Sequence, residues 1–152
     1  MRKILLASLG MLIAASPALA AGKPRPKVEY LSTEATIALK LPFSEAVRVG
    51  NTLYLSGVVG LVPGTRTIVA GGIEPETRQV LDTIKAVLER NGSSMDRVVK
   101  CTVMLADMSQ WAKMNTIYMT YFTQHFPARS AMGVNGLALG AQVEIECIAT
   151  VD

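Results

Sequence analysis

One amphipathic helix between alternating segments constrains the fold of this chain most strongly. Between Pro75 and Asn91 the apolar residues form a single stripe with helical spacing: Val80, Leu81, Ile84, Val87 and Leu88. Pro75 suits the first turn of such a helix, and Asn91-Gly92 suits its end. A helix with one apolar stripe must bury that stripe against another layer, so the flanking segments have to supply a sheet.

The flanking segments alternate apolar and polar residues, as strands do. Residues 46–49 and 52–56 predict a hairpin around the two-residue turn Gly50-Asn51. Four of its apolar residues are predicted to face the core: Val47, Val49, Leu53 and Leu55. Further strands are predicted over residues 98–105, over 130–134 and from 142 onward.

A second helix, capped by Asp107 or Ser109, is predicted to run to about Gln124. Its apolar stripe is predicted as core: Trp111, Met114, Ile117, Tyr118, Tyr121 and Phe122. Right-handed strand–helix–strand crossovers place both helices on the same side. We therefore predict an α+β domain, a single mixed sheet with two helices packed on one face. The uncovered face predicts self-association and carries Tyr54, Ser56, Lys100, Thr102, Glu144, Glu146 and Ile148.

The first twenty residues match a secretory signal peptide. Arg2 and Lys3 form a charged start, residues 5–15 an apolar run too short to span a membrane, and Ala18-Leu19-Ala20 a cleavage site. The alternative is an apolar first helix of the domain. We predict a signal peptide over 1–20, a partly flexible lead-in over 21–40 that can add an edge strand, and a secreted or periplasmic protein without a membrane partner.

Charge and ligand counts exclude two classes of function. The chain has 15 Lys and Arg against 12 Asp and Glu, and loss of Arg2 and Lys3 leaves 13 against 12. A nearly neutral mature chain has no clustered basic face, so no nucleic-acid partner is predicted. One histidine and two cysteines give no metal-ligand spacing, so no metal is predicted.

Cys101 and Cys147 lie in two of the predicted strands. Buried thiols in strands usually behave as inert, small apolar side chains, and this is the prediction for both. A disulfide between them requires that the two strands are neighbours with suitable geometry. An exported protein meets an oxidising compartment, so that alternative stays open.

The residues best suited to chemistry lie near the C-terminal end. Arg129 follows the helix-breaking Pro127, and Glu144 and Glu146 share one face of the last strand. In one interpretation Arg129 forms a structural ion pair with a glutamate, across strands or subunits. In the other, the guanidinium of Arg129 binds a substrate carboxylate. Glu146, with its pKa raised at a dry subunit boundary, then handles protons on water.

Five blocks of the sequence resemble signature blocks of the RidA (YjgF/UK114) family. They are Leu41-Pro42-Phe43-Ser44-Glu45-Ala46-Val47, Leu55-Ser56-Gly57, Thr77-Arg78-Gln79-Val80-Leu81, Pro127-Ala128-Arg129-Ser130 and Val143-Glu144-Ile145-Glu146. The resemblance identifies residues 41–152 as a RidA-like domain. It implies a chorismate mutase-like fold and a homotrimer with clefts between subunits. It also implies hydrolysis of reactive 2-imino acids, such as 2-iminopropanoate and 2-iminobutanoate, to 2-keto acids and ammonia without a cofactor.

The resemblance also implies roles for individual residues. Arg129 pairs with the carboxylate of the substrate, the backbone N–H of Ala131 helps to hold it, and Glu146 activates the attacking water. The pocket is lined by Ser56, Gly57, Asn115 and Phe43. Phe43 stands where active members usually have Tyr, and Ala131 replaces a frequent Cys.

Phe43 and export favour an alternative function, a non-catalytic trimer of the same fold that binds a small carboxylate or acts like a chaperone. Ribonuclease activity, claimed for some relatives, is a third hypothesis. It needs a phosphate-binding surface, for which the nearly neutral mature chain has little charge.

Overall fold

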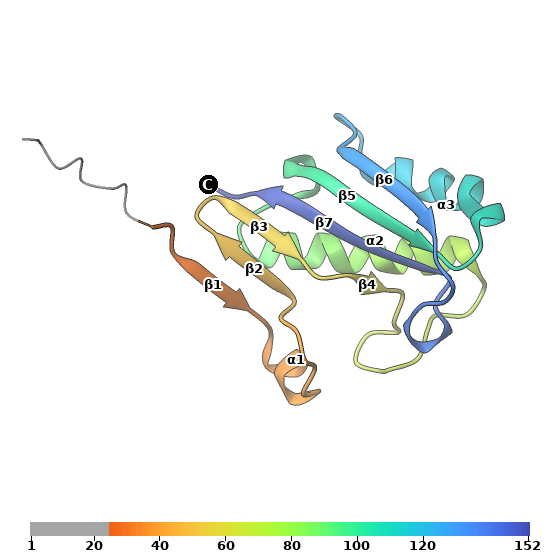
Figure 1. Ribbon diagram of the computed structural model, residues 1–152, viewed down its shortest axis with the longest axis horizontal. Helices are drawn as coiled ribbons and strands as arrows, with labels where there is room; N and C mark the ends of the chain where they lie inside the picture. The colour runs from red at the N-terminus through yellow and green to blue at the C-terminus, as the bar shows by residue number, and fades with distance from the viewer. Residues whose placement is uncertain (1–24) are drawn as a thin grey trace, which may run out of the picture.

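The computed structural model describes residues 25–152, which form one seven-stranded sheet (Figure 1). The strands are β1 (Val28–Leu31), β2 (Ala46–Val49), β3 (Thr52–Leu55), β4 (Val58–Val59), β5 (Val98–Leu105), β6 (Ala128–Gly133) and β7 (Val143–Thr150). Their order is β1-β2-β3-β7-β5-β6, and β4 also pairs with β7. β5 and β6 are parallel, whereas β7 is antiparallel to β3, β4 and β5. The predicted α+β class with a single mixed sheet is confirmed.

Two helices cover one face of this sheet, α2 (Ile73–Arg90) and α3 (Trp111–Tyr118) (Figure 1). The predicted stripe of α2 is buried, and Met114 and Ile117 of α3 belong to the same core. α3 is shorter than predicted, because a 3₁₀ turn (Met119–Tyr121) follows it and Phe122 leaves helical geometry at φ −116° and ψ 85°. The remaining short elements are α1 (Glu34–Ala38) and 3₁₀ turns over Met95–Arg97, Met108–Gln110 and Ala138–Gly140.

The lead-in supplies an edge strand, as the sequence predicts, because β1 pairs with β2. α1 follows it and is fastened by Glu45, whose carboxylate accepts hydrogen bonds from the hydroxyls of Thr33 and Thr36. Arg90 of α2 also donates to Glu45, at 2.6 Å. The predicted signal peptide lies outside the described residues. Within residues 25–152, no helix is long and apolar enough to cross a membrane.

The β2–β3 hairpin has the predicted turn at Gly50-Asn51, which pairs Val49 with Thr52, but the faces of β2 differ from the prediction. Ala46 pairs with Leu55, and Val47 pairs with Tyr54. Cross-strand partners point to the same face, so Ala46 joins the buried side while Val47 faces away from the helices. The prediction that Val47 and Val49 face the core is therefore wrong. The core-facing side of β2 instead carries the small, buried Ala46.

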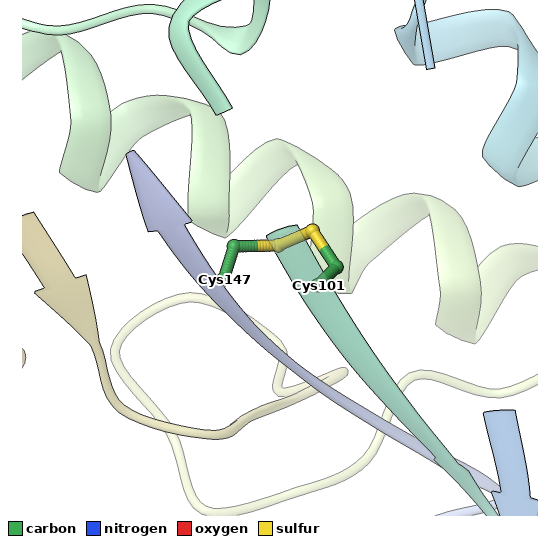
Figure 2. Close-up of a disulfide and its surroundings, with 2 residues drawn as sticks. All are labelled: Cys101 and Cys147. Carbon is green, nitrogen blue, oxygen red and sulfur yellow. A yellow bond between two sulfur atoms is a disulfide. The ribbon is translucent and has the colours of Figure 1, made fainter. Parts of the chain in front are cut away.

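Cys101 and Cys147 form a disulfide, so the prediction of two inert thiols is wrong (Figure 2). β5 and β7 are neighbours, and these residues stand directly opposite each other with their Cα atoms 4.1 Å apart. Both side chains are buried, at 0% and 2% exposure, on the face that packs against the helices. The bridge therefore joins two central strands inside the core.

The face opposite the helices has the predicted composition in its centre. A shallow hollow of about 190 Å³ is lined there by Tyr54, Leu55, Lys100, Thr102, Glu146, Cys147 and Ile148. We call this side of the sheet the open face. Ser56 departs from the prediction, because the strand ends at Leu55 and the hydroxyl of Ser56 donates to the carbonyl of Ser44 at 2.7 Å.

Candidate functional site

Two carboxylates project from β7 onto the open face, and their surroundings differ. Val143 and Ile145 are fully buried on the helix side of β7. Side chains alternate along a strand, so Glu144 and Glu146 point to the open face. Glu146 is exposed and stands opposite Thr102 of β5. Glu144 is half-buried and stands opposite Val59 of β4.

The carboxylate of Glu144 lies directly on the backbone of Gly57. A Cβ atom at Gly57 would be 2.9 Å from Cδ of Glu144, a distance that real side chains do not tolerate. Only glycine allows this approach. Burial, and secondly the negative charge of Glu146, raises the pKa of Glu144. Glu144 is therefore a stronger base than an ordinary glutamate.

Phe43, Ser56 and Gly57 line one groove of about 560 Å³. The groove runs between α1, the segment before β2, β4 and α2. Its size falls within the range of small-molecule sites. The ring of Phe43 is 52% exposed, so it offers an apolar surface but no hydrogen-bonding group. We call Phe43, Ser56, Gly57 and Glu144 the glutamate half-site.

Arg129 lies on β6, the strand at the other edge of the sheet, and points to the helix side because it pairs with the buried Cys101. Its guanidinium carbon is 4.6 Å from the ring centre of Tyr118 and 5.9 Å from that of Trp111. Both distances suit cation–π contacts. Among the described residues, no carboxylate lies within ion-pair distance of Arg129, so a structural ion pair within one chain is excluded.

Two further polar groups near Arg129 lack partners. The Oδ1 atom of Asn115 and the hydroxyl of Tyr118, one turn apart on α3, are buried without a hydrogen bond in the described chain. Burial raises the pKa of Tyr118 to about 12. Ala131 follows Arg129 by two residues on the same side of β6. We call Asn115, Tyr118, Arg129 and Ala131 the arginine half-site.

The sequence does not identify three residues that contact or support the half-sites: Trp111, Tyr118 and Glu76. The helical stripe predicts Tyr118 and Trp111 only as core, although Trp111 remains 41% exposed beside Arg129. Glu76 is 1% exposed, although a glutamate in the first turn of a helix usually lies in solvent. No sequence pattern marks it as buried. Its position next to the family-like block at Thr77 is the only available signal.

The two half-sites cannot meet within one chain. Glu144 and Glu146 project from the open face of β7, whereas Arg129 projects to the helix side from β6, two strands away. The sequence assigns all these residues to one cleft. One copy of the chain brings together Phe43, Ser56 and Gly57, and separately Asn115, Arg129 and Ala131. In the part of the chain described, no cluster of His, Cys, Asp and Glu could hold a metal ion.

Comparisons with known proteins agree with this architecture. The family model described as Endoribonuclease L-PSP matches residues 33–151. Reactive Intermediate Deaminase A of Arabidopsis thaliana is 44% identical over 82% of this chain and 66% of its own length. The 2-iminobutanoate/2-iminopropanoate deaminase of Mus musculus is 44% identical over 80% of this chain and 90% of its own length.

A solved structure supports the same assignment. The yeast protein YEO7 superimposes with a TM-score of 0.77 at 38% identity, over 83% of this chain and all of its own. The chain therefore belongs to the RidA (YjgF) family, whose model is described as Endoribonuclease L-PSP.

Proposed function

We propose that this protein hydrolyses reactive 2-imino acids to 2-keto acids and ammonia, in a cleft that combines the half-sites of two copies. The observation that carries the proposal is the unpaired guanidinium of Arg129, held on an aromatic surface beside two unpartnered polar groups. A half-buried cation without a counter-ion favours an anionic ligand. Two relatives at 44% identity are named as deaminases, one of reactive intermediates and the other of 2-iminobutanoate and 2-iminopropanoate.

Arg129 binds the carboxylate of the substrate. Its planar fork can donate two parallel hydrogen bonds, and the rings of Trp111 and Tyr118 hold the fork in place. β6 is an edge strand, so part of its backbone faces away from β5. The N–H of Ala131 on this strand supplies a further donor to the carboxylate, and the amide of Asn115 lines the same pocket.

A carboxylate on the open face activates the water. The sequence assigns this role to Glu146, but the surroundings favour Glu144, because Glu144 lies half-buried against Gly57 and burial raises its pKa above that of an ordinary glutamate. Glu144 takes a proton from water while the oxygen attacks C2 of the protonated imine, and the C=N electron pair moves to nitrogen. Glu144 then passes this proton to nitrogen and accepts the proton of the new hydroxyl group while ammonia leaves and the carbonyl of the 2-keto acid forms. Transfer of that last proton to ammonia gives ammonium and restores the carboxylate. The protonated imine is itself the electrophile, so no cofactor is required.

Assembly of several copies completes the site. The open face carries exposed apolar groups that a monomer would leave in water, among them Tyr54 (46% exposed) and Met132 (44% exposed). Copies that pack through this face, as in the trimer that the family resemblance implies, bring the edge strand β6 of one subunit next to Glu144 of another. This arrangement gives one cleft for each pair of neighbours.

Export is part of the same proposal. The signal-like residues 1–20 motivate it, and the buried disulfide supports it, because stable disulfides are typical of proteins that fold in oxidising compartments. The substrate would then be an imino acid formed or released outside the cytoplasm. A precursor fused to a reporter that is active only after export would test this, with deletion of residues 1–20 as the control.

A second candidate is a trimer that binds a small carboxylate without turnover, favoured by Phe43, which lacks a hydroxyl in the glutamate half-site. RNA cleavage has less support, because the single histidine, His125, is exposed in the loop between α3 and β6. Thermal shift with 2-keto acids separates the two main candidates. Stabilisation without hydrolysis supports binding alone.

The deaminase proposal is tested by generating 2-iminopropanoate with an amino-acid oxidase and following its trapping by semicarbazide. Wild-type protein should slow trapping by removing the imine, and Arg129→Ala should not. Arg66→Ala, which removes an exposed arginine from the loop after β4, is the matched control and should behave as wild type. Equal trapping with wild type and Arg129→Ala would contradict the proposal.

A further inference from the structure

Glu76 is the one fully buried carboxylate among the described residues. It lies in the first turn of α2, and its side chain enters the core next to Ile73 and Val80. A carboxylate in such a position is costly unless hydrogen bonds compensate for the lost water. Its presence requires an explanation.

The Oε1 atom of Glu76 accepts two backbone hydrogen bonds from the start of β7. The donors are the N–H groups of Gln142, at 2.8 Å, and Val143, at 3.3 Å. These residues directly precede Glu144. The Oε2 atom is buried and has no partner in the described chain. Glu76 thus fastens α2 to the point where β7 begins, at the cost of one unsatisfied oxygen.

Gly60 rests on the same side chain from the other direction. A Cβ atom at Gly60 would lie 2.5 Å from Cγ and 2.9 Å from the carbonyl oxygen of Glu76. Gly60 directly follows β4, and β4 directly follows Gly57. Glu76 therefore contacts both segments that bring Glu144 and Gly57 together. It accepts hydrogen bonds from the start of β7, and it packs closely against Gly60 at the end of β4.

We propose that Glu76 is a positioning residue that sets the contact between Glu144 and Gly57 by fixing the start of β7 and the end of β4 to α2. The proposal rests on the proposed function for its kinetic consequences only. Displacement of a catalytic group by about 1 Å can lower the rate by about 100-fold. A residue that acts on Glu144 alone should change turnover and leave binding of the carboxylate by Arg129 intact.

The test compares Glu76→Leu, which removes the acceptor, with Glu76→Gln, whose amide oxygen can still accept both N–H groups. Glu74→Gln, an exposed change in the same turn, is the control. Glu76→Leu should lower kcat by about 10-fold or more, with KM within about two-fold of wild type. Glu76→Gln should retain most of kcat. A correctly assembled Glu76→Leu trimer with wild-type kcat would overturn the proposal.

A readout without turnover keeps this inference separate from the deaminase proposal. The titration of the Glu144 carboxyl can be followed by carbon NMR, with Glu144→Gln to assign its signal. Glu76→Leu should lower the pKa of Glu144 towards its ordinary value, because the group leaves its half-buried place. If Glu76→Leu does not fold, Gly60→Ala pushes on the intact Glu76 and should give the same change. An unchanged Glu144 titration in the folded variant would overturn the proposal, whether or not the protein is a deaminase.

Discussion

Arg129 and Glu144 project from opposite faces of one sheet, Arg129 towards the helices from the edge strand and Glu144 onto the open face from a central strand. Rotation of either side chain cannot bring the two together, because β5 and its buried residues separate them. A substrate held at both ends must therefore contact two copies of the chain. The site therefore takes Arg129 from one copy of the chain and Glu144 from another.

The two glutamates of β7 should differ in their effect on turnover. Glu144→Gln should lower kcat by about 10²- to 10⁴-fold, the usual contribution of a general base. Glu146→Gln changes an exposed residue of the same strand and should lower kcat less than about five-fold. The semicarbazide assay measures both. A larger loss of kcat in Glu146→Gln than in Glu144→Gln would instead identify Glu146 as the general base.

The pH dependence of kcat/KM should show the raised pKa of Glu144. A general base must be deprotonated, so activity should fall as the pH falls through that pKa, at a higher pH than for an ordinary glutamate. Glu146→Gln removes the neighbouring negative charge, which lowers the pKa of Glu144 and shifts the acid limb to lower pH. If Glu146→Gln does not move the acid limb of the kcat/KM profile, a group other than Glu144 controls that limb.

The aromatic support of Arg129 should govern binding of the substrate. Tyr118→Leu removes the ring that lies 4.6 Å from the guanidinium and should raise KM by about 3- to 10-fold, which corresponds to about 1 kcal/mol. Tyr118→Phe keeps the ring and removes only the unpartnered hydroxyl, so KM should stay near that of wild type. A large loss of kcat in Tyr118→Phe would instead indicate that the hydroxyl contacts the substrate.

The disulfide should contribute strongly to stability. It closes a sequence separation of 46 residues, for which the chain-entropy model gives about 4 kcal/mol. The double variant Cys101→Ala/Cys147→Ala should lose about this free energy of unfolding in urea at fixed protein concentration. Reductant should destabilise the wild type and leave the double variant unchanged. Two free thiols in protein purified under oxidising conditions would contradict the bridge.

Local periodicity accounts for most of the fold. The alternation of residues 98–105 and 143–150 and the stripe of α2 give the strands, their buried faces and the single helical layer. The hairpin faces are predicted less well. Val47 and Val49 alternate as regularly as Ala46 and Arg48. The two-residue turn at Gly50-Asn51 decides which pair is buried, because it places Ala46 and Arg48 opposite Leu55 and Leu53.

The site depends on relationships between distant segments, which a single sequence does not specify. The disulfide requires that β5 and β7 are neighbours with Cys101 opposite Cys147. The separation of Arg129 from Glu144 requires the register of β6 on β5. The burial of Glu76 depends on backbone N–H groups 66 and 67 residues away. The residue types suggest the chemistry, but tertiary pairing decides which atoms can meet.

Mixed trimers of two inactive variants test the composite site most directly. Arg129→Ala and Glu144→Gln subunits, co-expressed with different tags and purified through both, should form some clefts with an intact Arg129 from one subunit and an intact Glu144 from the other. Every trimer that contains both kinds of subunit has one such cleft in three, so about one third of wild-type activity should return, although each variant alone is inactive. Activity no higher than that of the separate variants would contradict a site shared between subunits.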